Sequence, residues 1–547
     1  MGLLNLVKDY ISENKFIFFL YIFVCCFGYF IRVIILSLLF GKFWSLDKDK
    51  FVSIIKQICF VWILLSVIYI IWTRLNYRIV PDFLGYIRMR LVKNYISINE
   101  TNFNNNNVNE DVNNIFELSR NMKDVFVWVC EVLVPILVLM LILNVYFLFN
   151  YQIVGIINIV GNIVNYIISL TSYSKLIDSA NLRLDKFIYL NGKVNENFNN
   201  LFNAYINNRT TDIVNEQKKI ELDYYNCFES QMKEVELFGI KLRYNNYFFA
   251  FLTLFFLYKN YSKEEFVNCL IIYAFYLTSI ENMIDNVPSI VSTIGNAIRN
   301  YEKLNNTEYV EQKRLISKIE NFKGEINFNK VTFKYPFDET NTYVIKNFSL
   351  YIPSKSKVAI IAQSGSGKTT LIKLLLGFYS IEEGEILLDG ININSIEPTL
   401  IRSHINYINQ KTLLLNDTIM NNMRYGNDKT EEEIIQLLNQ YDLLKVFNQP
   451  LEQPERCLQK IVEKDGNNIS LGMQKVIYLV RGIMRDCNIY VFDEPLTSID
   501  PNTRQNVINM IKSKTENKTL IIITHDMEIT SIVDKVINFD EINHNEN

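Results

Sequence analysis

The sequence predicts a two-part fold, in which an all-α membrane domain precedes an α/β domain with a largely parallel sheet. Three observations predict it. Long apolar runs fill the N-terminal half, and short β-branched strands alternate with helical segments after about residue 321. The composition is intermediate, because 49% of the 547 residues are hydrophobic and the mean hydropathy is +0.08. A chain with one membrane part and one water-soluble part explains all three.

The charge balance limits the classes of partner. The formal net charge is −3 and the isoelectric point about 5.9, so the chain lacks the cationic field of a nucleic-acid-binding protein. The eight cysteines include no CxxC pair, and most lie in or beside apolar stretches. They indicate small buried side chains in a reducing compartment, and we expect neither a disulfide framework nor a zinc site.

Six apolar runs predict six membrane spans. The first run, residues 16–40, carries one charge in 25 positions. A helix of that length is about 37 Å long, more than the thickness of a bilayer core. The predicted spans lie near 16–40, 52–73, 124–148, 152–172, 244–258 and 263–283. They define a membrane domain over residues 1–300.

The connections between the spans alternate between short and long. Short loops are expected around 41–51, 149–151 and 259–262, whereas 74–123 and 173–243 are long, polar and helical in pattern. The long segments carry most of the basic residues close to the spans, which places them on the cytoplasmic side. These residues are Arg78, Arg88, Arg90, Lys93, Arg120, Lys123, Lys175, Arg183 and Lys186. We therefore expect long cytoplasmic extensions of the membrane helices.

Two ionisable residues fall inside predicted spans. Arg32 lies within the first span and Glu131 early in the third. A charge in the hydrocarbon core is costly, so such a residue usually faces a cavity or a partner group. We expect Arg32 to line an internal path through the membrane domain. For Glu131 the same role competes with a position just outside the bilayer.

The pattern changes after a polar connector at residues 301–320. From 321 to 547 short runs such as KVAIIA, IYVFDE and TLIIITH alternate with helical segments, which is typical of a buried parallel sheet. KVAIIA leads into a Gly-rich loop and a helix, the order that cradles phosphates with backbone N–H groups. The loop residues are Gln363, Ser364, Gly365, Ser366, Gly367, Lys368, Thr369 and Thr370. Lys368 is expected to reach the β- and γ-phosphates and Thr369 to hold Mg²⁺, although Ala362 replaces the first glycine of the pattern.

A pair of acids ends the strand IYVFD. Asp493 is placed to hold Mg²⁺, and Glu494 to orient or deprotonate an attacking water, which is the division of labour that phosphoryl transfer requires. Alone, two acids after an apolar strand are as often a solvated turn.

Taken together, residues 321–540 resemble the ATP-binding-cassette (ABC) ATPases, with the family's motifs in the family's order. The resemblance implies that Tyr335 stacks on adenine and that Gln410 contacts Mg²⁺ and the membrane domain. It also implies that Asp500 belongs to the D-loop and that His525 is the switch histidine that senses the γ-phosphate.

The signature segment departs most from the family. The family's LSGGQ falls on Ile469 to Met473, so Ser470 and Gly472 are kept while Leu471 replaces a glycine and Met473 the glutamine. A one-residue shift would restore a glutamine at Gln474. In the family this segment closes over ATP held by a partner subunit. Leu471 adds bulk where close approach is needed, so we expect ATP binding with weaker closure and slower turnover.

The six spans and the nucleotide-binding domain together resemble an exporter-type half-transporter of the multidrug and lipid-flippase branch. The resemblance implies ATP and Mg²⁺ as ligands, a dimer with a second half-transporter, and coupling helices near 97–106 and 203–213. It also implies a multi-pass membrane protein with a cytoplasmic nucleotide-binding domain that exports a substrate by alternating access. Two other interpretations remain, a catalytically weak subunit of a heterodimer and a soluble ABC ATPase of translation or repair. The residues name no substrate, and they leave homodimer and heterodimer open.

Overall fold

The computed structural model describes most of the chain in two compact units. One unit consists of Met1–Ile96 and Asn105–Glu308, and the other of Ser97–Asn104 and Tyr309–Asn547. The described residues are 2–44, 51–100, 108–305, 316–319, 321–335, 342–361, 363, 365–410, 413–447, 454–463 and 466–543. The division after Glu308 lies inside the connector predicted at 301–320. The sequence did not indicate that the short segment Ser97–Asn104 belongs with the second unit.

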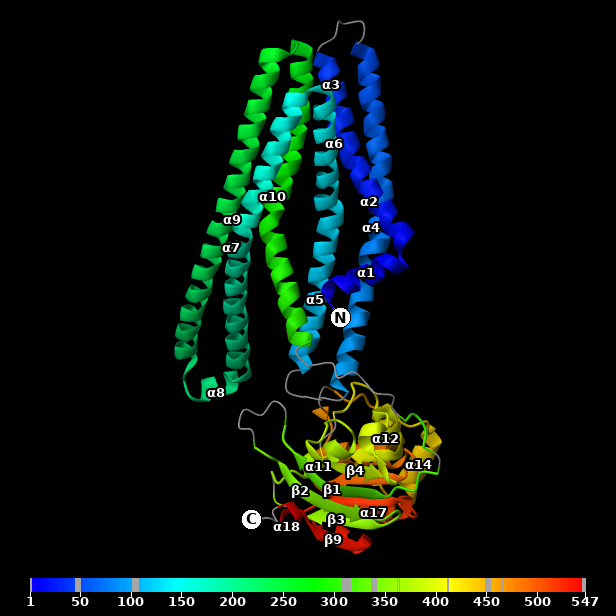
Figure 1. The fold of residues 1–547 in the computed structure, drawn as a ribbon. Helices are drawn as coiled ribbons and strands as arrows, with labels where there is room; N and C mark the ends of the chain where they lie inside the picture. The colour runs from blue at the N-terminus through cyan, green and yellow to red at the C-terminus, as the bar shows by residue number, and fades with distance from the viewer. Residues whose placement is uncertain are drawn as a thin grey trace. The chain divides into compact units, whose positions relative to one another are not determined.

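All secondary-structure elements in the described residues of the membrane unit are helices (Figure 1). Its helices are α1 (Leu3–Glu13), α2 (Lys15–Phe30), α3 (Leu36–Trp44), α4 (Phe51–Asn99), α5 (Val108–Trp128), α6 (Val134–Asn150), α7 (Gln152–Asn199), α8 (Leu201–Ile206), α9 (Thr210–Asn260) and α10 (Lys263–Asn305). Two five-residue π-helical turns, η1 (Ile31–Ile35) and η4 (Val129–Leu133), join α2 to α3 and α5 to α6. Each pair therefore runs on as a single long helix.

Five helical segments in the described part of the chain are long and apolar enough to cross a membrane. They are Lys15–Lys42, Phe51–Asn99, Asp111–Asn150, Gln152–Asn199 and Glu265–Leu304. The predicted span 244–258 lies in α9, which is not among these five segments. The sixth span remains a prediction. The length of α4, α7 and α9, 49, 48 and 51 residues, agrees with helices that extend beyond the bilayer.

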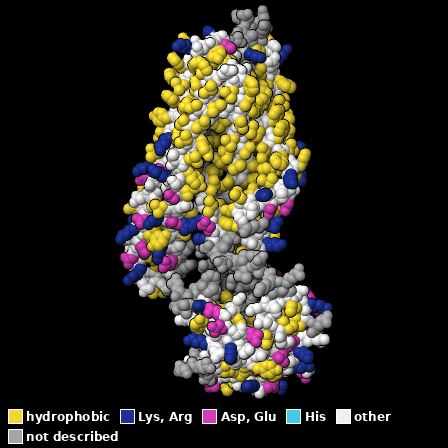
Figure 2. Space-filling model, in the orientation of Figure 1, with side chains coloured by type: hydrophobic (Ala, Val, Ile, Leu, Met, Phe, Trp, Pro, Cys, Tyr) yellow, Lys and Arg dark blue, Asp and Glu magenta, His cyan; other side chains and the backbone are white. Residues whose placement is uncertain are grey.

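The surface of the membrane unit is unusually apolar. Large side chains such as Phe23 and Leu141 are more than half exposed, at 60% and 67%. Figure 2 shows hydrophobic side chains covering the upper helices of this unit, whereas charged side chains gather on the lower parts of α7 and α9. Such a surface is stable against lipid and not against water.

Small and polar residues hold α7 and α9 together. A Cβ atom on Gly161 would lie 2.8 Å from Cγ of Phe249, so only glycine permits this approach. The side chain of Asn245 donates to the carbonyl of Gly161 at 3.0 Å and to Oδ1 of Asn165 at 2.8 Å. Small residues and amide hydrogen bonds are the usual means of helix association in membranes, where apolar burial gives little driving force.

Helix α1 is an element that the sequence analysis missed. Its apolar residues Leu6 and Tyr10 are buried, and the Tyr10 hydroxyl donates to Oδ2 of Asp82 at 3.0 Å. The ring of Tyr10 packs edge-on against Phe83 with centroids 5.0 Å apart. Two apolar residues spaced one helical turn apart are a weak signal for a helix beside the long apolar run that follows.

The coupling helices predicted from the resemblance are only partly covered by described residues. Residues 97–99 end α4, and 101–106 lie outside the described part of the chain. The second predicted segment, 203–213, overlaps the short helix α8 and the first turn of α9. In Figure 1 α8 joins the ends of α7 and α9.

The second unit contains two sheets. A four-stranded sheet has the order β2-β1-β4-β5 and antiparallel pairing, and a five-stranded parallel sheet has the order β6-β7-β8-β3-β9. The strands are β1 (Ile326–Phe333), β2 (Ile345–Ile352), β3 (Lys357–Ile361), β4 (Glu383–Leu388), β5 (Ile391–Asn392), β6 (Ile405–Ile408), β7 (Ile489–Asp493), β8 (Thr519–Ile523) and β9 (Lys535–Asn538). Every residue of β7 and β8 is buried, which explains why both strands are apolar apart from Asp493 at the end of β7 and Thr519 at the start of β8.

Helices cover the parallel sheet. They are α11 (Lys368–Leu375), α12 (Pro398–His404), α13 (Ile419–Arg424), α14 (Glu431–Gln440), α15 (Pro454–Leu458), α16 (Leu471–Ile483), α17 (Pro501–Lys514) and α18 (Phe539–Asn543). One apolar core joins α13, α14, α16 and α17 to β7 and β8, and a second joins α11 to the antiparallel sheet. The predicted α/β architecture is therefore confirmed.

The short segment that precedes residue 101 packs within this second unit. The Arg402 guanidinium donates to Oε1 of Glu100 at 3.0 Å and to the Glu100 carbonyl at 2.9 Å. Arg402 is half-buried, and burial lowers its pKa against the raising effect of Glu100. A charged group in such a site requires a partner, which Glu100 supplies.

Candidate nucleotide-binding site

The predicted site residues meet at one edge of the parallel sheet. Strands β6, β7, β8 and β3 are consecutive neighbours and run in the same direction, so their carboxyl ends lie together. The residues that follow these strands are Gln410, Asp493, His525 and the Gly-rich loop. This edge is where parallel α/β sheets bind ligands.

The backbone of the Gly-rich loop requires its glycines. Gly365 and Gly367 have φ angles of +83° and +104°, in the left-handed region that side chains avoid. A Cβ on Gly367 would also lie 3.2 Å from the carbonyl oxygen of Val344. Gly367 precedes the first residue of α11, and no side chain in the described part of the chain caps this helix end. The first N–H groups of α11 are therefore available to an anion. Ala362 and Ser364 lie outside the described residues.

Two side chains of the loop are suited to a phosphate. Oγ of Ser366 is buried and has no hydrogen-bond partner among the described residues. Nζ of Lys368 donates to the Gln363 carbonyl at 3.0 Å and lies 3.2 Å from Nε2 of His525. Burial lowers the pKa of Lys368, opposed by the charges of Glu494 and Asp493. An orphan buried hydroxyl beside a desolvated cation fits a phosphate group.

Asp493 is a buried carboxylate at the end of β7. Its Oδ2 accepts a hydrogen bond from the Tyr407 hydroxyl at 3.0 Å, and burial raises its pKa against the opposing effects of Tyr407 and Lys475. A buried acid of this kind is stabilised by a cation. Thr369 is exposed in the first turn of α11 and Gln410 is exposed just after β6, and both supply oxygen donors. With the Asp493 carboxylate these are oxygen ligands of the type that Mg²⁺ prefers.

Sequence reasoning missed Tyr407 and Lys475. Lys475 lies in α16, is only 3% exposed, and its Nζ lies 3.5 Å from the carbonyl oxygen of Gln410. Burial lowers the pKa of Lys475 to about 8, with Asp493 and Glu494 opposing the change. The signal was a lone lysine within the apolar face of a helix. Lys475 belongs to no recognisable motif, because the residues that it contacts come from distant segments of the sequence.

Glu494 and His525 face each other across the ends of β7 and β8. Nε2 of His525 lies 3.7 Å from Oε1 of Glu494. The Glu494 backbone has a φ angle of +48°, and its N–H donates to the Ile523 carbonyl at 2.8 Å. A non-glycine residue held at positive φ is strained, and such strain is typical of functional positions. The arrangement links Lys368, His525 and Glu494 in one chain of contacts.

Tyr335 lies against the helix that follows the Gly-rich loop. Its hydroxyl is 2.8 Å from Oγ1 of Thr370, and its ring packs edge-on against Phe333 and Tyr379 with centroids 5.1 and 5.3 Å away. Thr370 is therefore a buried partner of Tyr335. The stacking of Tyr335 on adenine and a phosphate contact of Thr370 remain predictions.

The signature segment begins α16 without a shift of register. Ser470 caps the helix, since its Oγ accepts from the Met473 N–H at 3.2 Å, and Leu471 is 66% exposed. Met473 is buried. The side chain of Gln474 donates to the Gly466 carbonyl at 2.9 Å, so it is held by the preceding loop. Gln474, the glutamine that a one-residue shift of the motif would supply, is therefore held by a hydrogen bond to its own chain.

The D-loop packs beside the signature segment. A Cβ on Gly472 would lie 3.4 Å from the carbonyl oxygen of Ser498, an ordinary contact distance. Ser498 itself has a φ angle of +67°. Asp500 caps α17 by accepting from the N–H groups of Asn502 and Thr503, and hydrogen bonding from the Thr503 side chain lowers its pKa. Asp500 thus has a structural role in the described chain.

Comparison with known proteins agrees with this fold. Residues 345–497 match the ABC transporter family. The structure of a bacterial Atm1-family ABC exporter with ATP bound is similar with a TM-score of 0.78, at 16% sequence identity, over 98% of this chain and 94% of that one. The chain therefore has the fold of an ABC exporter, and the prediction of an exporter-type fold is confirmed.

Several curated relatives match about half of the chain. The transport/processing ATP-binding protein ComA of Streptococcus pneumoniae is 30% identical over 278 residues, 50% of this chain and 38% of that protein. The mitochondrial iron-sulfur clusters transporter ATM1 of Candida albicans is 34% identical over 266 residues, 48% and 34% of the two chains. The ATP-dependent lipid A-core flippase of Sodalis glossinidius is 31% identical over 219 residues, 40% and 37%. The chain spans less than two-fifths of the length of these relatives.

Within the second unit, residues 345–497 therefore match the ABC transporter family, and relatives named as ATP-binding transport proteins share about 30% of the matched sequence. The resemblance to exporter-type half-transporters, drawn from the motifs, is likewise confirmed.

Proposed function

We propose that the chain is one half of a dimeric ABC exporter that moves a substrate across a membrane with the energy of ATP. The observation that carries the proposal is the phosphate cradle formed by Ser366, Lys368 and the start of α11. Among the described residues the Ser366 hydroxyl has no partner and the start of α11 has no side-chain cap. The multi-pass membrane unit supplies the path, and the ATP-binding domain lies in the cytoplasm.

The residues of the cradle divide the work of ATP hydrolysis. Lys368 and the loop N–H groups bind the phosphates, and Glu494 accepts a proton from the attacking water. His525 positions Glu494 from 3.7 Å and contacts Lys368, so it is placed to sense the end of the phosphate chain. Thr369, Gln410 and Asp493 hold Mg²⁺, which neutralises charge on the phosphates when bound.

A second half-transporter completes each ATP site. In this proposal the helix start at Ser470 and Gly472 closes over ATP bound to the partner, and Asp500 lies at the same junction. ATP binding brings the two ATP-binding domains together and hydrolysis separates them, which drives the membrane helices between inward-facing and outward-facing states. In this proposal the membrane unit, and not the ATP-binding domain, binds the transported substrate.

The experiment that tests this function is ATP turnover of the full chain in lipid, beside the variant Glu494→Gln. Turnover should fall at least about 100-fold in the variant, as expected when a general base is removed, while ATP binding is retained. Glu516→Gln, an exposed acid beyond α17, is the matched control. Turnover that persists in Glu494→Gln would remove the proposed base.

A second function is favoured by the signature segment. Leu471 is exposed at the start of α16, and the Ser470 hydroxyl already accepts a hydrogen bond from the N–H of Met473 in its own helix. Both features favour a catalytically weak subunit that pairs with a more competent half-transporter. This alternative predicts ATP binding without turnover by the chain alone, and turnover on addition of a partner with an intact signature segment.

A further inference from the structure

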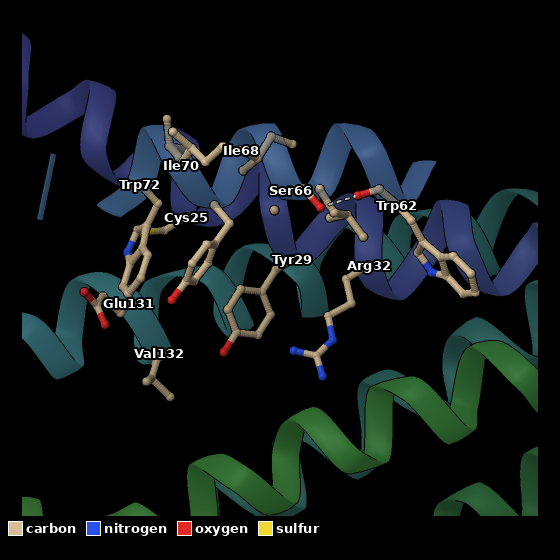
Figure 3. A pocket seen from close by; sticks show the side chains of 14 residues that line it. Cys25, Tyr29, Arg32, Trp62, Ser66, Ile68, Ile70, Trp72, Glu131 and Val132 are labelled. Atoms are coloured by element: carbon tan, nitrogen blue, oxygen red, sulfur yellow. Dashed lines mark hydrogen bonds between the residues drawn. The ribbon is translucent and has the colours of Figure 1, made fainter. Parts of the chain in front are cut away.

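The membrane unit contains a cavity that the motifs did not indicate. It has a volume of about 800 Å³ and lies between α2, α4 and η4. Figure 3 shows Cys25, Tyr29 and Arg32 entering from the first helix, Trp62 and Trp72 from α4, and Glu131 from the third. The volume is in the range of cavities that bind small molecules.

Both intramembrane charges line this cavity, and both lie on π-helical turns. Arg32 is part of η1, where the N–H of Leu36 donates to the Ile31 carbonyl five residues back. Glu131 is part of η4, where the N–H of Val134 donates to the Val129 carbonyl in the same way. π-turns are rare and occur frequently at functional sites.

Each π-turn has a local cause. Pro135 lacks the N–H that an α-helix would direct to the Glu131 carbonyl, and its ring crowds that carbonyl. In the first helix the Ser37 hydroxyl donates to the Ile34 carbonyl at 2.8 Å and also to that of Val33, which competes with the regular ladder. Residues close to Arg32 and Glu131 in the sequence therefore account for the π-turns at these two positions.

The two charges differ in how they are supported. Glu131 accepts a hydrogen bond from the hydroxyl of Tyr21, a residue with no exposed surface that also donates to Asn76 at 3.3 Å. Arg32 forms no hydrogen bond or ion pair with any residue that the structure describes, and the two charges do not pair with each other. Both act electrostatically on Tyr29, which lies between them in Figure 3.

An unpartnered guanidinium within a membrane helix is costly, so a bound anion would stabilise it. The rest of the wall is largely aromatic and apolar and includes Tyr29, Trp62, Tyr69 and Trp72. The cavity therefore offers a site for an acid at Arg32, a site for an amine at Glu131, and an aromatic and apolar surface on the rest of its wall.

We infer that this cavity binds an amphiphilic zwitterion, with its carboxylate or phosphate on Arg32, its amine on Glu131 and its apolar part against the tryptophans. As the site for transported substrate, this inference rests on the proposed export function. The ligand chemistry has two sources, a short apolar peptide with free ends and a phospholipid with an amine in its head group.

Tryptophan fluorescence of the full chain reads binding without ATP. All four tryptophans of the sequence, Trp44, Trp62, Trp72 and Trp128, lie in the membrane unit, and two of them line the cavity. The probe is trileucine, compared with its N-acetyl form and its C-terminal amide in phosphatidylcholine nanodiscs. Trileucine should bind at least about tenfold more tightly than either blocked form, since each loses a charge-assisted hydrogen bond.

Two variants assign each charge. Arg32→Gln should bind trileucine and its amide equally, and Glu131→Gln, which still accepts from Tyr21, should bind trileucine and its acetylated form equally. Lys56→Gln removes an exposed charge of α4 outside the cavity and should change nothing. Unaltered emission of the free variants shows that the helices remain folded.

The lipid arm replaces part of the phosphatidylcholine with phosphatidylethanolamine. A fluorescence change that needs both charges and appears with this lipid but not with trileucine identifies the membrane lipid as the source. Trileucine binding with the charge pattern above identifies the peptide-like source. If neither probe binds in a way that depends on Arg32 and Glu131, the inference is wrong. Binding is measured without ATP, so loss of turnover alone would contradict only the proposed function.

Discussion

Two helix starts in the ATP-binding domain have opposite designs. At α11 the preceding residue is Gly367 with a left-handed backbone, no side chain caps the helix, and the Ser366 hydroxyl is buried without a partner among the described residues. At α16 the Ser470 side chain caps the helix and the side chain of Leu471, the first helical residue, is exposed. One start is prepared for an anion and the other is satisfied by its own chain.

The difference teaches that the two halves of a composite ATP site can weaken separately. An uncapped helix start keeps its N–H groups unsatisfied, which is tolerable only where a ligand or water takes them. A capped start gains about 1 kcal/mol of stability and loses part of its affinity for an anion. In this chain the start of α11 is open to an anion, whereas the start of α16 is capped by Ser470.

The largest expected effect is on the α11 side. Lys368→Ala should lower ATP affinity by roughly 10- to 100-fold, because a charged hydrogen bond is worth about 1.5 to 3 kcal/mol. Binding of a fluorescent ATP analogue to the full chain measures it. Lys512→Ala, an exposed lysine on α17, is the control. Equal affinities for the two variants would break the comparison, since α11 would then not be the anion site.

A smaller effect is expected on the α16 side. Leu471→Gly should raise ATP turnover by about tenfold, the equivalent of ~1.4 kcal/mol of better closure. Leu471→Ala separates the two causes, because it removes the bulk of leucine and keeps its restricted backbone. A gain only in the glycine variant assigns the effect to the backbone. No gain in either variant would show that Leu471 does not limit closure.

The smallest effect is local. Ser470→Ala removes the cap of α16 and should lower the protection of its first turn by about 1 kcal/mol, measured by amide hydrogen exchange of the full chain. Thr430→Ala removes the capping box of α14 and should reduce protection there alone. If Ser470→Ala leaves exchange unchanged, the cap is not what satisfies the α16 start.

How much could be predicted depended on whether a function is encoded in consecutive residues. The Gly-rich loop, Asp493 with Glu494, and His525 each follow a buried strand, and the parallel topology brings them to one edge. Lys475 and Tyr407 reach the same edge from other segments, and nothing in their local sequence shows their partners. Contact across the fold, and not residue type, defines them.

In the membrane unit the charges could be found but their setting could not. Arg32 and Glu131 stand out against apolar runs, yet they are 99 positions apart and share a cavity only because α2 and η4 pack together. The π-turns have no pattern of their own, since Pro135 and Ser37 are tolerated in ordinary membrane helices as well. Helix α1 was missed for the opposite reason, because its few apolar residues are weak beside the run that follows.

The π-turns also set the rotational phase of the helices that contain them. A π-turn holds one more residue than an α-turn, so the helix beyond it is rotated by about 100° relative to an uninterrupted α-helix. The first and third membrane helices are therefore each composed of two segments in different phases. Converting η1 to regular α-helix at the same chain length would therefore turn every side chain of α3 by about 100°, whereas deleting one residue within η1 would restore the regular ladder and leave α3 in its present phase. The π-turn, and not only the residues of α3, thus decides which side chains of α3 face the other helices.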